Sequence, residues 1–182
     1  MLDRKTALDL VNEHVKTKNL VKHCLAVEAI MRVLATRFNQ DAEIWGLAGL
    51  LHDLDYEYTK DKPELHGLKT VEILKSHDVP EEVLDAILAH CEKKERETLM
   101  EQAIYVSDPM SGFIVAAALI TPEKSLSVID VDFLNRRFKE KLFAKGANRQ
   151  QMMVCEKMGL SLNEFFEISL EAMKAISKDL GL

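Results

Sequence analysis

Apolar residues recur every three or four positions along most of the chain, which is the spacing of helices that bury one face. The first such stretch, residues 3–17, places Leu8, Val11 and Val15 on one side. Residues 20–38 continue the pattern with a second apolar set: Leu20, Cys24, Val27, Met31 and Leu34. No stretch alternates strictly between apolar and polar residues, so the sequence predicts no substantial sheet.

Capping and helix-breaking residues predict where the later helices begin and end. Asp41 is suited to cap a third helix, and Pro80 opens a helix that ends near His90. Pro109 is expected to separate two helices, 97–107 and 111–120. Three more helices are predicted after a loop at Thr121-Pro122, over residues 131–145, 147–158 and 161–179. Ser161 and Glu164 form a capping-box pattern at the start of the last one.

These patterns together predict an all-α fold of about nine helices joined by short turns. The length of 182 residues suits a single domain, and there is no repeat, low-complexity run or Gly/Ser linker. With 47% apolar residues, seven Gly and four Pro, the composition excludes a collagen-like or disordered chain.

Charge and cysteine content narrow the class of protein further. The net charge of −6 argues against general nucleic-acid binding. Cys24, Cys91 and Cys155 are too few and too scattered for a disulfide framework, so we expect a cytoplasmic protein. The N-terminal residues carry charges where a signal peptide is apolar, and the longest uncharged apolar stretch, residues 112–120, is short of the ~20 residues that span a bilayer. We therefore expect no membrane association.

The most distinctive run, Leu47-Ala-Gly-Leu-Leu-His-Asp-Leu-Asp, is apolar except for its acidic residues and His52. A carboxylate buried there without a partner is costly, and a divalent cation held together with imidazoles would neutralise Asp53. Adjacent side chains point ~100° apart on a helix, so His52 and Asp53 can bind one metal only where the helix ends. The polar loop that leads to Pro63 is consistent with such an end. An ordinary surface His-Asp pair is the alternative.

The His-Asp dipeptide belongs to a larger set. His23 on an early helix, the run AGLLHD with His52 and Asp53, and Asp108 roughly fifty residues later resemble the signature of the HD superfamily of metal-dependent hydrolases. The resemblance covers about residues 20–115, the helical core of that family. It implies an HD-domain-like helical bundle in one domain, residues 1–182, with additional C-terminal helices over about residues 128–182.

The resemblance also implies a ligand set. One metal ion would be held by His23, His52, Asp53 and Asp108, and a second by His66, His90 and Asp53 acting as a bridge. Such a nitrogen and oxygen environment suits one or two divalent transition metal ions, namely Fe, Mn, Co, Ni or Zn, rather than Ca or Mg. Each residue also has a plainer interpretation: His66 as an exposed side chain, His90 as a complement to a helix dipole, and Asp108 as a helix cap.

Residues for proton transfer and substrate binding are less marked. Asp53 would act through the metal-activated water, while Asp55 and Glu57 are candidate proton donors. The segment 136–149 is strongly basic, and a helix there would align Arg137, Lys141 and Lys145 on one face and Leu134, Phe138 and Leu142 on another. We expect phosphate-binding side chains, unless these charges form only a solvated helix face: Lys69, Arg137, Lys141 and Arg149.

The resemblance implies a metal-dependent phosphohydrolase whose partner is a small phosphorylated substrate, a nucleotide or another metabolite, attacked by metal-activated water. Two alternatives stay open: a di-iron oxygenase that uses the same ligands, and a non-catalytic regulatory module that binds a nucleotide or metal. Cyclic-dinucleotide phosphodiesterases of the superfamily carry Lys four residues after the motif His. This chain has Tyr56 there and lacks their Gly-Tyr-Pro extension, which weakens that interpretation.

Overall fold

The structure is a computed structural model that describes all residues 1–182, and it contains helices and turns without a strand. The predicted all-α fold is confirmed. The elements follow in the order α1 (Arg4–His14), α2 (Lys18–Arg37), α3 (Ala42–Leu51), α4 (Tyr56–Thr59), η1 (Pro63–Leu65), α5 (Leu68–Leu74), α6 (Glu81–His90), α7 (Leu99–Leu119), η2 (Leu126–Val128), α8 (Val131–Lys139), α9 (Arg149–Met153), η3 (Val154–Met158), α10 (Leu162–Ala175) and α11 (Ser177–Leu180).

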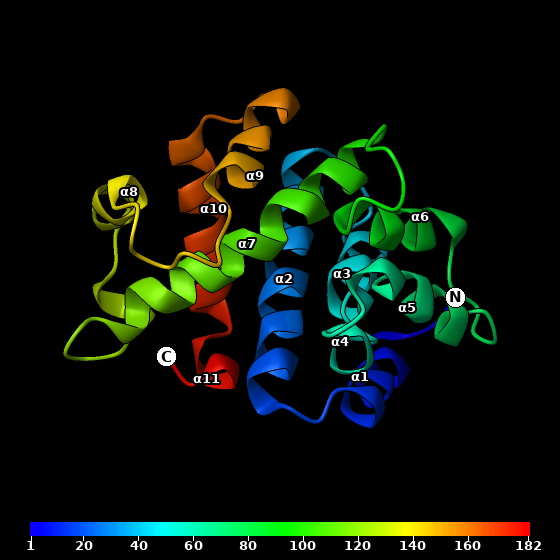
Figure 1. Cartoon of the computed structure of the whole chain (residues 1–182). Helices are drawn as coiled ribbons and strands as arrows, with labels where there is room; N and C mark the ends of the chain where they lie inside the picture. The colour runs from blue at the N-terminus through cyan, green and yellow to red at the C-terminus, as the bar shows by residue number, and fades with distance from the viewer.

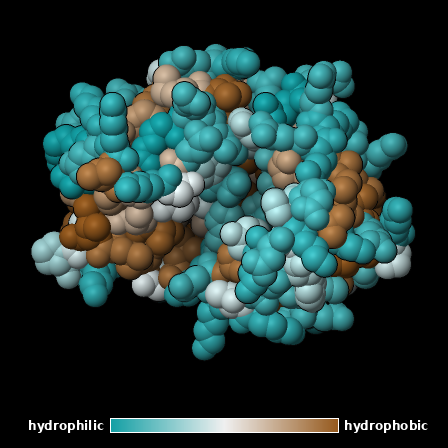
Figure 2. Space-filling model, in the orientation of Figure 1, coloured by the Kyte–Doolittle hydropathy of each residue, from teal (hydrophilic) through white to brown (hydrophobic).

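Two long helices, α2 and α7, occupy the middle of the molecule and pack against each other (Figure 1). Helices α3 to α6 lie to one side of them, and α8 to α11 lie on the other. The space-filling view of the same face shows a hollow near its middle that is lined with hydrophilic residues (Figure 2). None of the helices combines the length and apolar composition that crossing a membrane requires.

Side-chain caps begin the helices where the sequence predicts them. Asp41 accepts hydrogen bonds from the amides of Glu43 and Ile44 at the start of α3. The predicted capping box of Ser161 and Glu164 opens α10. Each of these caps satisfies backbone N–H groups that have no partner inside the helix.

The prediction of two helices separated at Pro109 is wrong, because α7 runs without a break from Leu99 to Leu119. Proline removes the N–H that would bond to the carbonyl four residues earlier, here that of Tyr105. The side chain of Gln151 donates to this carbonyl at 2.6 Å and replaces the missing bond. Gln151 lies in the C-terminal helices, so the continuity of α7 depends on a residue that is distant in the sequence.

The predicted helix over 131–145 is also too long. Helix α8 ends at Lys139, and turns follow up to Gly146. The guanidinium of Arg149 donates to the carbonyl oxygens of Phe143, Ala144 and Ala147 at 2.6–2.8 Å, which stabilises this turn in place of a helix. Leu142 is 78% exposed instead of lying on an apolar face. Downstream, the stretches predicted as single helices are each divided in two, into α9 and η3 and into α10 and α11.

Aromatic side chains join the C-terminal helices to α7. Phe113 packs against Phe138, Phe143 and Phe166 with ring centroids 5.6–5.9 Å apart. The Arg149 guanidinium carbon lies 4.8 Å from the centroid of the Phe113 ring. The residues after about 128 therefore share one core with the predicted metal-binding residues.

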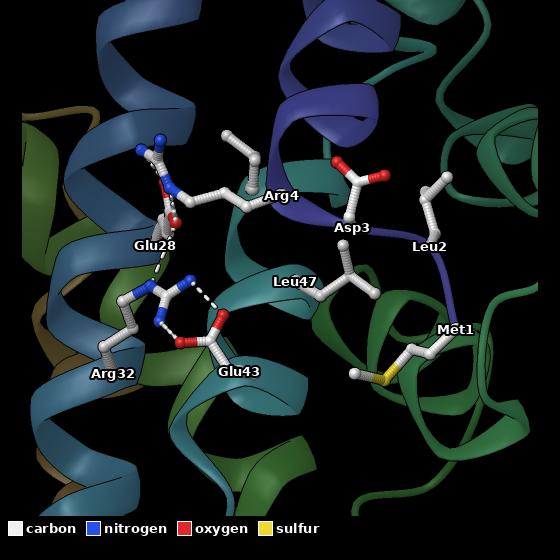
Figure 3. Close-up of a pocket in the computed structure, with 9 residues that line it drawn as sticks. Met1, Leu2, Asp3, Arg4, Glu28, Arg32, Glu43 and Leu47 are labelled. Atoms are coloured by element: carbon white, nitrogen blue, oxygen red, sulfur yellow. Dashed lines mark hydrogen bonds and ion pairs between the residues drawn. The ribbon is translucent and has the colours of Figure 1, made fainter.

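Helices α1, α2 and α3 are joined by a buried carboxylate between two arginines (Figure 3). Glu28 is 3% exposed, and it accepts hydrogen bonds from Arg4 at 2.6 and 2.9 Å and from Arg32 at 3.0 Å. Arg32 also forms a bidentate pair with Glu43 at 2.6 and 3.0 Å. This network fixes how α2 crosses α3 beside the point where α3 ends.

The crossing of α2 and α3 requires a glycine, and replacing it tests the packing. A Cβ on Gly49 would lie 2.9 Å from backbone atoms of Val27 and Glu28, whereas a Cβ on Gly112 would meet nothing within 4 Å. We expect Gly49→Ala to lower the free energy of unfolding by about 1–3 kcal/mol through overpacking. Gly112→Ala should raise it by up to about 1 kcal/mol, the difference in helix propensity. Urea unfolding of both variants tests this, and equal effects would contradict the close packing.

Candidate metal centre

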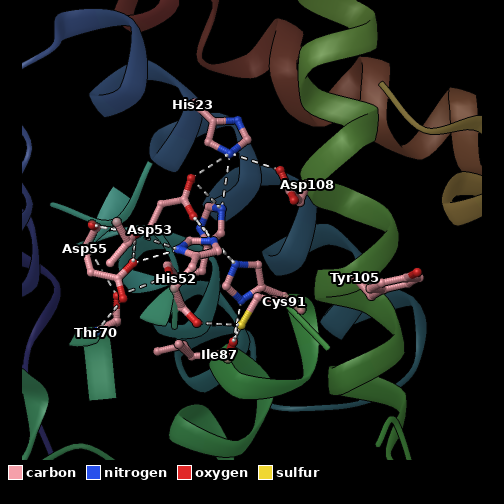
Figure 4. Close-up of polar contacts among 12 residues, drawn as sticks. His23, His52, Asp53, Asp55, Thr70, Ile87, Cys91, Tyr105 and Asp108 are labelled. Carbon is pink, nitrogen blue, oxygen red and sulfur yellow. Dashed lines mark hydrogen bonds and ion pairs between the residues drawn. The ribbon is translucent and has the colours of Figure 1, made fainter. Parts of the chain in front are cut away.

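Five segments far apart in the sequence bring four imidazoles and two carboxylates into one cluster (Figure 4). The members are His23 on α2, His52 and Asp53 after α3, His66 after η1, His90 at the end of α6, and Asp108 on α7. Of these, His52, Asp53 and His90 are buried, with 0%, 6% and 4% of their surface exposed. The tertiary fold, and not the local spacing of these residues in the sequence, brings the five segments together.

The end of α3 lets two adjacent residues face the same centre. Helix α3 stops at Leu51, and a turn follows in which the amide of Leu54 donates to the carbonyl of Leu51 and that of Tyr56 to the carbonyl of Asp53. His52 and Asp53 thus escape the ~100° separation that a continuing helix would impose. This agrees with the helix end expected from the loop before Pro63.

Asp53 lies between two groups of imidazoles. Its Oδ2 is 3.6 Å from Nε2 of both His23 and His52, and its Oδ1 is 3.4 Å from Nε2 of His66 and 3.6 Å from that of His90. Asp108 Oδ1 lies 3.2 Å from His23 Nε2, so it joins the first group. Each oxygen of one carboxylate therefore faces a separate set of ligand atoms.

The spacing of these atoms fits metal coordination. Nε2 of His23 lies 3.2 Å from Nε2 of His52, and the same distance separates Nε2 of His66 from Nε2 of His90. Ligands about 2.1 Å from a metal ion are about 3.0 Å apart at right angles and about 3.4 Å apart at tetrahedral angles. The separations of 3.2 and 3.4 Å lie within this range, and the three of 3.6 Å lie just above it.

The other ring nitrogen of each histidine is held by an acceptor. His52 Nδ1 donates to the carbonyl of Gly49 at 2.8 Å, and His90 Nδ1 donates to that of Ile87. His66 Nδ1 donates to Asp55 Oδ1 at 2.8 Å, and His23 Nδ1 donates to Ser111 Oγ at 2.8 Å. The Ser111 hydroxyl in turn donates to the carbonyl of Asp108.

These outer bonds fix the tautomer of all four rings. With the proton on Nδ1, each Nε2 carries a lone pair directed at the cluster, and two such lone pairs 3.2 Å apart repel each other unless a cation or proton lies between them. Histidines that bind metals in proteins have the same arrangement. The residues present therefore fit divalent transition metal ions.

The electrostatics of the cluster favour a cation as well. Burial opposes ionisation of Asp53, but the nearby imidazoles of His52, His90 and His23 outweigh it and hold the pKa of Asp53 well below its usual range. Burial lowers the pKa of His52 to about 4 and keeps that ring neutral. Burial also opposes protonation of His23, yet its hydrogen bond to Asp108 outweighs burial and raises the pKa of His23.

Asp55 does not lie where the proton donor predicted from the sequence would lie. Its side chain is fully buried, with one oxygen bonded to His66 Nδ1 and the other accepting the amide of Thr70 at 2.9 Å. The hydroxyl of Thr70 accepts the amide of Asp55 in return. Asp55 thus orients His66 from behind the cluster and has no path to a leaving group.

The structure does not bring Glu57 or the expected phosphate-binding side chains to the cluster. Glu57 accepts the amide of Thr17 at 2.6 Å, and hydrogen bonding to the side chain and the amide of Thr17 lowers the pKa of its carboxyl. Lys69 pairs with Glu72 and lines a different hollow, and Arg137 pairs with Glu140. Lys141 is exposed in the turn after α8, so Arg137, Lys141 and Lys145 do not share a helix face. Arg149 binds backbone carbonyls as described above.

Sequence reasoning did not identify Ser111 or Thr70. Ser111 lies three residues after Asp108, one helical turn further along α7, and that spacing is the only local signal for its place beside His23. Thr70 has no local signal, because its bond to Asp55 joins residues 15 positions apart.

The raised pKa values predict how metal binding depends on pH. For His66 as for His23, burial opposes protonation but the neighbouring carboxylates outweigh it, so both pKa values lie above 6.5 in the absence of metal. Protons therefore compete with metal at and below neutral pH. We expect the affinity for Mn²⁺, measured calorimetrically from pH 8 to pH 6, to fall about tenfold or more. His77→Ala serves as a control that keeps this profile, and an affinity independent of pH would contradict the assignment.

The hydrogen bond between Asp55 and His66 predicts that a substitution of Asp55 lowers metal affinity at one of the two sites only. Asp55→Asn weakens the acceptor behind His66, and comparable changes behind metal ligands lower metal affinity about 10–100-fold. We expect this loss at the site of His66 and His90, with the affinity of the site of His23, His52 and Asp108 unchanged. A Mn²⁺ titration fitted to two sites resolves the two affinities. Asp61→Asn, a substitution of an exposed residue, is the control. An equal loss at both sites would indicate general unfolding instead.

Comparison with known proteins places the cluster in a family. A family model described as HD domain matches residues 20–135. The chain is 26% identical over 162 residues to Ribonuclease Y of Sulfurovum sp. (strain NBC37-1), which covers 87% of this chain and 32% of that protein.

Two further relatives match over about half of the chain. Ribonuclease Y of Lawsonia intracellularis is 30% identical over 97 residues, and that of Aliarcobacter butzleri is 32% identical over 95 residues. These matches cover 53% and 52% of this chain and 19% and 18% of the relatives, so the chain spans about a third or less of their length. No solved structure matches. Because the family match covers more than half of the sequence, and all six clustered ligands lie within it, the chain belongs to the HD domain family of metal-dependent hydrolases.

Proposed function

We propose that the chain is a binuclear phosphohydrolase that cleaves a small phosphorylated metabolite. The observation that carries the proposal is the position of Asp53, whose two oxygens face two separate imidazole pairs. His23, His52 and Asp108 would hold one metal ion, and His66 and His90 the other, with Asp53 shared between them. When bound, two such ions supply a hydroxide nucleophile near neutral pH and polarise a phosphoryl oxygen.

The protein's own contribution is to hold the ligands in place. Gly49, Ile87, Ser111 and Asp55 each accept from one Nδ1, which keeps four Nε2 lone pairs aimed inward. The burial of His52, Asp53 and His90 excludes water from the inner side of the centre and strengthens its electrostatic interactions. No serine, cysteine or threonine nucleophile is required, and Ser111 is engaged by His23.

A second candidate is RNA cleavage, favoured by the name of the curated relatives. Single-stranded RNA is normally held in a basic groove with stacking aromatic side chains. Three hollows next to the C-terminal helices include cluster residues. Two of them contain no lysine or arginine in their walls, the third contains Lys22 as its one basic residue, and the chain carries a net charge of −6. These features favour a small substrate over RNA.

Metal analysis together with a substrate panel tests the proposal. We expect about two metal ions per chain by elemental analysis and about one in His66→Ala, which removes a ligand of one site only. In the presence of Mn²⁺ the wild type should hydrolyse phosphomonoesters, and Asp53→Asn should lower kcat at least about 10³-fold, because both sites share this residue. His14→Ala, on the surface, is the matched control.

Each other function has its own outcome. Preferred cleavage of an RNA oligonucleotide would favour the second candidate. Oxygen consumption that depends on iron, with no activity on Mn²⁺ or Zn²⁺, would indicate an oxygenase. Metal binding without turnover across the panel would indicate a regulatory module.

A further inference from the structure

A hollow of about 500 Å³ adjoins the half of the cluster formed by His66 and His90. Figure 4 labels two of its other residues, Cys91 next to the cluster and Tyr105 on α7 to one side of it. Its walls come from the loop before α5, the end of α6, the first half of α7 and the start of α9. The lining residues are Pro63, His66, His90, Cys91, Glu92, Tyr105, Asn148, Gln150 and Gln151.

The wall opposite the histidines is polar and carries no positive charge. Three amide side chains, Asn148, Gln150 and Gln151, come from one short segment, and Glu92 provides the only carboxylate. Asn148 Oδ1 accepts the amide of Gln151, so its NH₂ group is left for a ligand. Gln150 is exposed, and neither end of its amide is engaged within the chain.

The same wall is held rigidly. The Gln151 side chain donates to the Tyr105 carbonyl at 2.6 Å, and the Tyr105 hydroxyl donates to Glu92 at 3.3 Å. The Arg96 guanidinium carbon lies 3.7 Å from the centroid of the Tyr105 ring, where its charge is engaged by the ring and by Glu92 at 3.8 Å. A fixed aromatic ring beside free amides suits an uncharged polar ligand with a flat or hydroxyl-rich surface.

The charge of the centre limits what else can enter. Four neutral imidazoles and the carboxylates of Asp53 and Asp108 would leave two divalent cations with two net positive charges, or with one once a hydroxide is bound. The dianion of one phosphomonoester is enough to neutralise either. A second phosphate on the substrate would extend into the hollow beside Glu92, where no lysine or arginine lines the wall. Such a charge would find no cationic partner in the wall and would be repelled by the Glu92 carboxylate.

We propose that this hollow is the subsite for the uncharged alcohol half of a phosphomonoester, such as the nucleoside of a nucleoside monophosphate or the ring of a sugar monophosphate. The inference rests on the proposed function, since it places the phosphate at the metal centre. We call the hollow the alcohol subsite.

The segment that completes the alcohol subsite lies beyond the part of the chain that the HD domain model matches. The family match ends at residue 135, whereas the amide wall begins at Asn148. Arg149, through its bonds to three carbonyls, holds the preceding turn against α7. In this proposal the C-terminal helices add the amide wall to the subsite, and the metal ligands all lie within the HD domain match.

Gln150 is the residue with which to test the subsite, because it is exposed and bonds to nothing within the chain. The experiment measures calorimetric affinity of the full, Mn²⁺-loaded protein for inorganic phosphate, adenosine 5′-monophosphate, adenosine 5′-diphosphate and glucose 6-phosphate. In the wild type we expect at least one monophosphate to bind about tenfold or more tightly than the diphosphate. Gln150→Ala should weaken the binding of that monophosphate several-fold and leave the affinity for inorganic phosphate unchanged. Gln150→Lys should shift the ratio of the two affinities about tenfold in favour of the diphosphate.

Gln40→Lys, which adds the same charge at an exposed position in the loop between α2 and α3, should change none of these affinities. The comparison of the two monophosphates distinguishes a nucleoside from a sugar as the occupant. The subsite is disproved if both Gln150 variants leave all affinities unchanged. It is also disproved if they change the affinity for inorganic phosphate as much as that for the esters, or if the wild type binds the diphosphate more tightly than either monophosphate. Failure of the proposed function looks different: the pattern of affinities holds, but none of the esters is hydrolysed.

Discussion

The structure depends on how one buried carboxylate is neutralised. Asp53 is 6% exposed, and four imidazole nitrogens surround it at 3.4–3.6 Å, each with its other nitrogen already bonded to an acceptor. Lone pairs and a negative charge cannot share so small a space without positive charge between them. Divalent metal ions would satisfy this requirement, and in the proposed binuclear site Asp53 would be shared between two of them. The outer bonds to Asp55 and Ser111 fix the orientation of the His66 and His23 rings.

The rest of the fold serves to hold that arrangement. The close crossing at Gly49 sets His23 on α2 against His52 after α3, and the long helix α7 brings Asp108 to the same place. The C-terminal helices take part as well, since Gln151 replaces the hydrogen bond that Pro109 removes from α7 one residue after Asp108. The same helices line one side of the hollow next to His66 and His90. Core and extension are therefore coupled at the site and do not act as separate modules.

Much of this was predictable from the sequence because it depends on local pattern. Helical periodicity predicted the all-α fold, and the resemblance of His23, His52, Asp53 and Asp108 to a family signature predicted a cluster that the structure assembles. The errors arose where distant residues override local rules: Pro109 does not break α7, because Gln151 compensates for it, and the basic helix ends early, because Arg149 binds the carbonyls of a turn. For the same reason, Arg137, Lys141 and Lys145 do not share the helix face that their spacing predicted.

The most direct test of the account is the position of bound metal. Crystals of the protein grown with Mn²⁺ and measured near the manganese absorption edge would show where the ions lie by anomalous scattering. The account predicts two peaks about 3.5–4 Å apart, one between His23, His52 and Asp108 and one between His66 and His90, with a carboxylate oxygen of Asp53 directed at each. A single peak, or peaks away from Asp53 with the imidazoles hydrogen-bonded to one another, would contradict it.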